Sequence, residues 1–258
     1  MQKFSIYAGV ATKYPFEERM AAIAAAGYDA VCLDFERDME GTEGTWESQM
    51  KLAQRYALPV ENVHLTGAGM NAVWSEGEEG EYMKNRLIDE LCEMGRLGVK
   101  IGVAHVTWGL NRPEANFEVG LRRYREAVEA AEKYGVQLAL ENSVFPEYVH
   151  FLFEHIQSPH LGFCYDSGHE NAFTPTENYL EKYGDILIAM HLHDNDGKRD
   201  LHTMPLHGTI DWKKKVGQLK RCRLFHEMIT LECSVFPGSN AEESFRGTLE
   251  EARKLLLL

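Results

Sequence analysis

The chain has 258 residues, of which 44% are hydrophobic and 26% are charged, and this is enough for one large core in a single domain. Its 40 acidic residues outweigh 27 Lys and Arg, and the net charge of -13 disfavours non-specific binding to nucleic acid or to an anionic membrane. No apolar run reaches the length of a membrane span, and the N-terminus lacks a signal-like apolar stretch. Five scattered cysteines without a C-x-x-C pair agree with a reducing compartment, so we expect a cytoplasmic protein.

Strand-like and helix-like segments alternate along the whole chain. The predicted strands are Phe4–Ala8, Ala30–Phe35, Val60–Thr66, Val103–Thr107, Gln137–Asn142, Leu161–Asp166, Ile188–His193 and Met228–Cys233. The predicted helices are Phe16–Ala26, Thr45–Tyr56, Tyr82–Leu97, Phe117–Tyr134, Glu147–Ile156, Thr176–Lys182, Trp212–Lys220 and Ala241–Leu257. This alternation predicts a closed α/β barrel, the (β/α)8 TIM barrel, as a single domain over residues 1–258. A doubly wound open sheet is the alternative, but no G-x-G-x-x-G motif follows a strand.

Two long loops interrupt the alternation. They are Gly67–Glu81, after the third strand, and Asp194–Asp211, after the seventh. In a barrel both loops would lie at the carboxyl-terminal rim, where substrates bind. The first loop contains four glycines and is also compatible with a disordered surface segment.

Polar side chains follow four buried strands at the point where each strand ends. The stretches are Glu141-Asn142, Asp166-Ser-Gly-His169, His191-Leu-His-Asp194 and Glu232. A carboxylate at the end of a buried strand is costly unless it is paired or binds a metal. Each stretch alone also fits a buried ion pair, a helix N-cap or a core histidine. Together these carboxylates and imidazoles form a mixed ligand set that suits Mn²⁺, Co²⁺, Mg²⁺ or Zn²⁺, so the sequence predicts a divalent metal site.

At these residues the chain resembles the xylose isomerase-like TIM barrels, a superfamily of sugar isomerases and epimerases that also contains endonuclease IV. The resemblance covers nearly the whole chain and extends to Leu206–Trp212, where His207 replaces the first glycine of a family motif. It implies that one divalent metal is held by Glu141, Asp166, His191 and Glu232. His191 is preferred over His193 because an acidic residue, Asp194, follows it by three positions, as in the family. His193 would then line the pocket.

The resemblance to endonuclease IV implies an alternative. That enzyme binds three zinc ions through nine ligands, and residues of matching type occur here at the four positions above and at His64, His105, His169, Asp200 and His202. A zinc-dependent phosphodiesterase that acts at abasic sites therefore stays open, with these residues and His193 as additional metal or substrate-binding groups. The cations near the predicted rim are few, which argues against the grip on phosphates that duplex binding requires.

The resemblance favours a metal-dependent isomerase or epimerase that acts on a sugar or a sugar phosphate. Glu232 and Glu141 would act as general base and general acid at adjacent carbons, and the metal would stabilise an enediolate. A dehydratase of inositol-type sugars and a non-catalytic barrel that binds a sugar or polyol are further alternatives. The expected substrate-binding residues are Trp108, Arg112, Lys198 and Arg199, with Trp74 and Phe145 as additional candidates for stacking on a sugar ring.

Other chemistries fit the sequence less well. No lysine lies within a predicted strand or at its carboxyl end, which disfavours a Schiff-base mechanism. Cys164 and Cys233 lie on strands beside the predicted ligands, and we expect both to face outward. The apolar run Leu255–Leu258 indicates a contact, either with the barrel wall or with another subunit, and so leaves association into homo-oligomers open.

Overall fold

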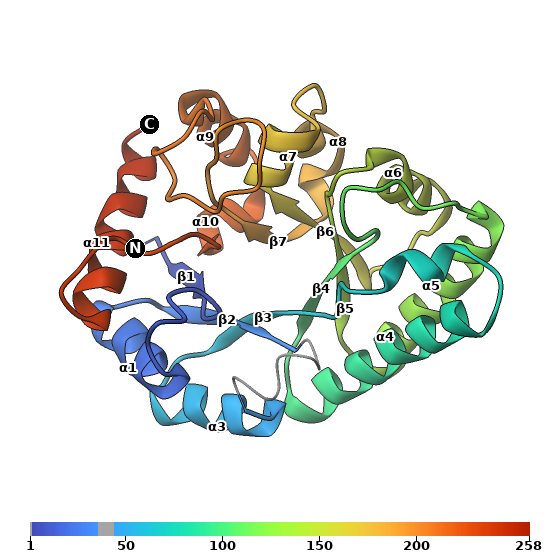
Figure 1. The fold of residues 1–258 in the computed structure, drawn as a ribbon, viewed down its shortest axis with the longest axis horizontal. Coiled ribbons are helices and arrows are strands. Elements are labelled where there is room, and N and C mark those ends of the chain that lie inside the picture. The colour runs from blue at the N-terminus through green and yellow to red at the C-terminus, as the bar shows by residue number, and fades with distance from the viewer. Residues whose placement is uncertain (1, 36–43) are drawn as a thin grey trace.

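Eight parallel strands form the inner wall of the molecule and helices surround them in the computed structural model, which describes residues 2–35 and 44–258 (Figure 1). The strand order is β7-β6-β5-β4-β3-β2-β1-β8, so β1 pairs with β2 on one side and with β8 on the other. A parallel bridge between Leu192, just after β7, and Leu231 of β8 brings the ring of strands to closure. The predicted (β/α)8 barrel is confirmed.

The strands and helices lie close to their predicted positions. The strands are β1 (Phe4–Tyr7), β2 (Ala30–Asp34), β3 (Val60–His64), β4 (Ile101–His105), β5 (Gln137–Glu141), β6 (Leu161–Asp166), β7 (Leu187–His191) and β8 (Ile229–Leu231). The α-helices are α1 (Phe16–Ala26), α3 (Trp46–Arg55), α4 (Glu78–Leu97), α5 (Phe117–Tyr134), α6 (Pro146–His155), α7 (Ser167–Phe173), α8 (Tyr179–Tyr183), α9 (Trp212–Leu219), α10 (Arg223–Glu227) and α11 (Ala241–Arg253). Among the described residues, the short 3-10 helices are η2 (Met70–Trp74), η3 (Gly184–Ile186) and η4 (Lys254–Leu257). The sequence pattern did not predict α7 or α10.

Sequence signals at the helix ends explain where the helices stop. Gly98 and Gly135 follow α4 and α5 with φ of +79° and +66°, the left-handed conformation that glycine adopts without strain. At the other end, Thr45 and Asn116 cap α3 and α5, each accepting a hydrogen bond from a backbone N–H of the first turn. In the described part of the chain, no helix combines the length and apolarity that a membrane span needs.

The loop after β3 is ordered by a buried tryptophan. Trp74, in η2, is fully buried, its indole N–H donates to Val106 O at 2.7 Å, and its ring packs edge-on against Tyr148. Trp74 is therefore part of the core, and its expected role in stacking on a sugar is wrong. Phe145 also packs against Tyr148, with ring centroids 6.3 Å apart.

The barrel interior below the rim is apolar on one side. Val103, Ala139, Cys164 and Ala189, one from each of β4 to β7, form a small buried cluster there. The expectation that Cys164 faces outward is wrong. Side chains two residues apart in a strand share a face, so Cys164 points inward with Asp166. Cys233, by contrast, packs in the outer core between the barrel and its helices.

Candidate metal centre

Consecutive strands of the barrel end in His, Asp or Glu side chains, and the parallel register brings these ends to one level. His105 of β4 stands opposite Glu141 of β5, and Asp166 of β6 stands opposite His191 of β7. Glu232 directly follows β8. Because the carboxyl ends of all eight strands face the same side of the barrel, these side chains meet at a single surface, hereafter the rim.

Glu141, Asp166, His191 and Glu232 form the buried centre of the rim, hereafter the central cluster. Each offers one ligand atom, and these atoms all lie within 4.8 Å of one another. His191 Nδ1 is 3.2 Å from Glu141 Oε1 and 2.9 Å from Glu232 Oε2. All four residues are buried. The structure thus brings together the four residues that the sequence predicts as metal ligands, with His191 as the imidazole among them.

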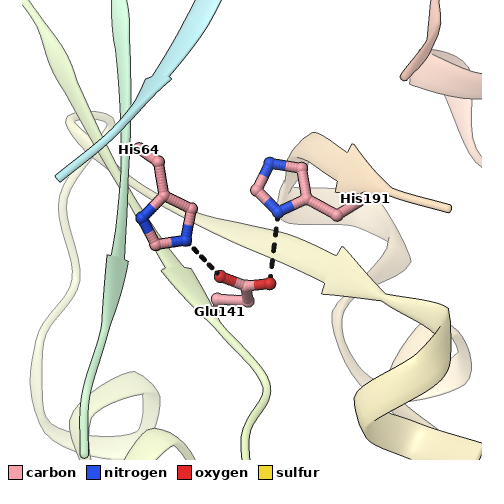
Figure 2. Close-up of side chains that lie close together, drawn as sticks. All are labelled: His64, Glu141 and His191. Carbon is pink, nitrogen blue, oxygen red and sulfur yellow. Dashed lines mark hydrogen bonds and ion pairs between the residues drawn. The ribbon is translucent and has the colours of Figure 1, made fainter. Parts of the chain in front are cut away.

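His64 and His105 flank the central cluster through the second oxygen of Glu141. His64 Nε2 lies 3.3 Å and His105 Nε2 lies 2.9 Å from Glu141 Oε2. Figure 2 shows the Glu141 carboxylate between the rings of His64 and His191, with one oxygen directed at each. The His64 and His105 rings meet edge to face, with centroids 4.9 Å apart. One carboxylate is therefore shared by three imidazoles from three strands.

A further group of ligand-type side chains surrounds Asp200 in the loop after β7. His169 Nε2 and His202 Nε2 lie 3.3 Å and 3.0 Å from Asp200 Oδ2. His193 Nε2 lies 3.6 Å from Asp200 Oδ1 and 3.0 Å from Asp166 Oδ2, which connects this group to the central cluster. The His193 and His202 rings stack with centroids 4.0 Å apart. The histidines expected as additional metal or substrate-binding groups therefore contact the central cluster, and Asp200 is joined to it through His169, His193 and His202.

Mutual pairing sets the charge of the rim. Burial alone would raise the pKa of Glu141, but His105 and His191 hold it well below its ordinary value. Burial also opposes the ionisation of Glu232, yet the neighbouring His191 lowers its pKa to about 2. Burial would lower the pKa of His64, and its ion pair with the Glu141 carboxylate instead raises that pKa to about 9. Glu141 and Glu232 are thus ionised, as carboxylate ligands of a cation must be.

The residues of the rim fit a divalent cation. Three carboxylates and an imidazole are a donor set that Mn²⁺, Co²⁺, Mg²⁺ and Zn²⁺ all accept. Glu141 Oε2 and Asp200 Oδ1 are buried and accept no hydrogen bond from any described residue, although imidazole nitrogens stand close to both. A buried carboxylate oxygen without a donor is costly, and coordination to a cation would remove that cost.

Local contacts fix Asp166 in place. Asn142 Nδ2 donates to Asp166 O, and Asn142 Oδ1 accepts from the Asp166 N–H, both at 2.8 Å. The Asp166 carboxylate accepts from the His169 N–H at 2.6 Å and so caps α7, while it also faces the central cluster. Gly168 is needed in this turn, because a Cβ there would lie 1.9 Å from His193 Cε1.

Asp194 organises the loop that carries Asp200 and His202. Its carboxylate accepts three hydrogen bonds at 2.8, 3.1 and 2.6 Å, from the N–H groups of Asn195, Ile210 and the Trp212 indole. Its backbone pairs with Thr203 in an antiparallel bridge. The acidic residue three positions after His191 is therefore an anchor of the loop.

The sequence did not predict two residues of the rim, Tyr7 at the end of β1 and Asp34 at the end of β2. The Tyr7 hydroxyl donates to Asp34 Oδ2 at 2.5 Å, and both residues line the cavity above the central cluster. Burial and the Asp34 carboxylate raise the pKa of the Tyr7 phenol, so it stays protonated. The strand-end pattern that singles out Glu141 applies equally to Asp34, whereas nothing in the sequence marks Tyr7.

The expected substrate-binding residues divide into two groups. Trp108 borders the cavity above the central cluster, and Lys198 and Arg199 line an adjoining cavity. Arg112 instead forms an ion pair with Glu147 at 2.9 Å and lines neither of these cavities. The structure thus places three of the four residues at the site and leaves Arg112 outside it.

The fold and the rim together define a TIM barrel with clustered His, Asp and Glu at the carboxyl ends of its strands. The sequence profile of the xylose isomerase-like TIM barrel family matches residues 20–255. The chain belongs to that family, which confirms the expected resemblance.

Solved structures of sugar epimerases share this fold. A D-tagatose 3-epimerase-like protein matches with a TM-score of 0.78 at 22% identity, over 99% of this chain and 97% of the other. D-psicose 3-epimerase from Clostridium cellulolyticum H10 gives 0.72 at 16% identity, over 99% and 97%. The 3-keto-D-glucoside 4-epimerase from E. coli gives 0.74 at 16% identity, over 98% and 100%. At these identities the likeness concerns the fold.

Two curated proteins are similar in sequence, and both are described as uncharacterized. Protein y4fM from Sinorhizobium fredii is 33% identical over 150 residues, which are 54% of this chain and 48% of that protein. Protein MJ1311 from Methanocaldococcus jannaschii is 33% identical over 106 residues, which are 37% and 36%. The chain thus aligns with half or less of the length of these relatives.

Proposed function

We propose that the protein is a divalent-metal-dependent isomerase or epimerase that acts on a sugar or a sugar phosphate. The observation that carries the proposal is the central cluster, in which three carboxylates and one imidazole converge at the rim of a barrel of this family. The fold neighbours named as sugar epimerases support the same substrate class.

A divalent ion held by Glu141, Asp166, His191 and Glu232 would supply Lewis acidity to the carbonyl and neighbouring hydroxyl of a keto sugar. The residues of the chain would then move the proton. Glu232 and Glu141 both contact His191 Nδ1, at 2.9 Å and 3.2 Å, and both line the cavity above it. In this proposal Glu232 removes a proton from the carbon next to the carbonyl. Glu141 returns one, to the opposite face of that carbon in an epimerase or to the former carbonyl carbon in an isomerase, where a second proton also passes from the hydroxyl oxygen to the former carbonyl oxygen.

The remaining residues of the cavity are suited to hold a polyhydroxylated substrate. The cavity measures about 210 Å³, and Tyr7, Asp34 and His169 are among its lining residues. The Tyr7 hydroxyl can accept a hydrogen bond while it donates to Asp34. His169 has two ring nitrogens, Nδ1 and Nε2, that can take part in hydrogen bonds. A sugar needs such alternating donors and acceptors because nearly every carbon carries a hydroxyl.

The test combines metal content with proton exchange. Mass spectrometry of the purified protein should find about one divalent ion per chain, and NMR in D₂O should show deuterium entering a ketohexose such as D-fructose or D-psicose. Glu232→Gln should slow deuterium exchange by more than about 100-fold, because general base catalysis contributes about that much to the rate. The variant should still bind the sugar. The matched control is Glu227→Gln, an exposed carboxylate on α10.

The results for metal uptake and for sugar exchange distinguish the isomerase proposal from a non-catalytic barrel. A protein that takes up no divalent ion on titration contradicts the proposal. Tight sugar binding without exchange in any ketose or aldose would leave a non-catalytic sugar-binding barrel in its place.

The extra ligand-type residues favour a second candidate function, a zinc-dependent phosphodiesterase that acts at abasic sites. His64 and His105 share Glu141 Oε2, and His169 and His202 share Asp200 Oδ2, so donors for further ions stand on both sides of the central cluster. Three zinc ions per chain and cleavage of an abasic duplex would support this candidate. Against it, Lys198 and Arg199 are the only Lys or Arg, among the described residues, that line the two rim cavities.

A further inference from the structure

A second cavity adjoins the one above the central cluster. The first, hereafter the metal pocket, measures about 210 Å³, and the second, hereafter the annex, measures about 390 Å³. They share four lining residues, which are His105, Trp108, His169 and Asp200. Small-molecule sites commonly measure about 300–1,000 Å³, so the metal pocket is small and the two cavities together form a site of ordinary size.

The walls of the annex differ from those of the metal pocket. Its apolar side is built from Trp108, Leu110, Val144 and Phe173. Its polar side includes the hydroxyls of Thr107 and Ser143, which lie 3.3 Å apart, and the residues Lys198 and Arg199. A pyranose ring has the same division, since its C–H groups form an apolar face and its hydroxyls project around the edge. Aromatic side chains bind such a face, and hydroxyls and cations bind the edge.

Trp108 stands between the two cavities and is held there firmly. Asn71 Nδ2 donates to Trp108 O, and Asn71 Oδ1 accepts from the Trp108 N–H, both at 2.8 Å. The indole lies directly on Gly67, where an added Cβ would meet the ring at 2.3 Å. Trp108 is nevertheless 42% exposed. An exposed aromatic ring that is fixed before binding is what a ligand platform requires, because little conformational entropy is lost.

Charge argues against an anionic group in the annex. The Arg199 guanidinium donates to Asp196 Oδ2 through Nε at 3.0 Å and Nη2 at 2.7 Å. Asp200 also lines the annex and is itself paired with His169 and His202. An anion would compete with these carboxylates for their partners, whereas a neutral occupant leaves the pairs intact.

We propose that the annex binds a second sugar ring, so that the substrate is a glycosylated keto sugar whose reacting ring lies in the metal pocket. This inference rests on the proposed function. The apolar face of the second ring packs on Trp108 and Phe173, and its hydroxyls bond to Thr107, Ser143 and Lys198. Trp108 contacts both rings, since it lines both cavities.

The test compares the affinity of the metal-loaded protein for D-fructose with that for two glycosylated forms, lactulose and isomaltulose, by titration calorimetry. Both disaccharides leave the carbonyl and the adjacent hydroxyl of the fructose unit free. At least one should bind about tenfold more tightly than fructose, which is the size of one good aromatic contact. Phe173→Ala should bring this ratio close to one. Phe236→Ala is the matched control, because Phe236 is 38% exposed and lines neither cavity.

A second variant, Leu110→Ser, keeps the test decisive if Phe173→Ala does not fold. Leu110 is 71% exposed, so Leu110→Ser should fold normally and should also reduce the ratio. Deuterium exchange measured on the same sugars distinguishes the two proposals. If fructose binds and exchanges but neither disaccharide binds more tightly, the annex proposal is overturned and the proposed function stands. If a disaccharide binds more tightly and no sugar exchanges, the annex proposal is supported as a binding site and the isomerase proposal fails. If no sugar binds, both are overturned.

Discussion

Asp194→Asn is the substitution with the sharpest expected effect, because that carboxylate accepts hydrogen bonds from three N–H donors. The N–H groups of Asn195 and Ile210 donate to Oδ1, and the indole N–H of Trp212 donates to Oδ2. An asparagine keeps only one acceptor oxygen. Whichever way its amide is turned, an NH₂ group must face a donor.

The amide orientation that costs less free energy of unfolding sets the expected magnitude. If the NH₂ group replaces Oδ2, the 2.6 Å bond from Trp212 is lost and the buried indole N–H keeps no acceptor. A hydrogen bond to a charged group contributes about 1.5–3 kcal/mol. The opposite orientation would break two backbone hydrogen bonds and cost more. For a chain of this size, each kcal/mol lowers the Tm by about 2–4 °C, so we expect a decrease of about 3–12 °C.

Thermal unfolding followed by circular dichroism measures this loss. Trp212→Phe removes the same hydrogen bond from the other side, so the double variant should lose less than the sum of the two single losses. Asp196→Asn, in the same loop but paired with the exposed Arg199, is the matched control and should change the Tm little. An Asp194→Asn protein that melts within about 1 °C of the wild type would refute the reasoning.

Three further predictions concern packing, thiols and metal. Gly120→Ala puts a Cβ 2.2 Å from the Trp74 ring and should destabilise the protein by about 1–3 kcal/mol in urea unfolding, whereas Gly217→Ala, with open space around it, should not. Cys92 is the one cysteine that is not buried, so Ellman's reagent should find one reactive thiol in the native protein and five after unfolding; rapid native reaction of Cys32 would contradict its burial and its pKa of about 12. Chelation should lower the Tm and added Mn²⁺ should restore it, and a Tm indifferent to both would count against the metal site.

The barrel and the central cluster could be predicted because both follow from one local pattern. Parallel strands that are buried on both faces appear as apolar runs, and their carboxyl ends must share one rim. A polar residue directly after such a run, as at Glu141 or Asp166, is therefore placed in space without any knowledge of tertiary contacts. Asp34 follows the same rule and was missed because an apolar residue, Phe35, comes directly after it.

Other features depend on contacts between distant segments and left no local signal. The turn at Asp166 starts α7 without an intervening loop, so the helix could not be separated from the end of the strand. Asn71 reaches Trp108 across 37 positions of sequence. The conformation of the loop after β7 depends on Trp212, which reaches back to Asp194. Residue types alone could not show that Arg112 would pair with Glu147 and stay outside the site.

The closure of the barrel has a consequence for the relation between binding and folding. Across β7 and β8, the described backbone joins through two hydrogen bonds, from Leu192 N to Thr230 O at 2.9 Å and from Glu232 N to Leu192 O at 3.2 Å. The neighbours of this short seam are His191 on one side and Glu232 on the other, whose side chains meet above it at 2.9 Å. A cation bound by both side chains would tie β7 to β8, so this short seam of the wall would be held by the same atoms that serve the substrate. Occupancy of the centre and integrity of the barrel would then rise and fall together.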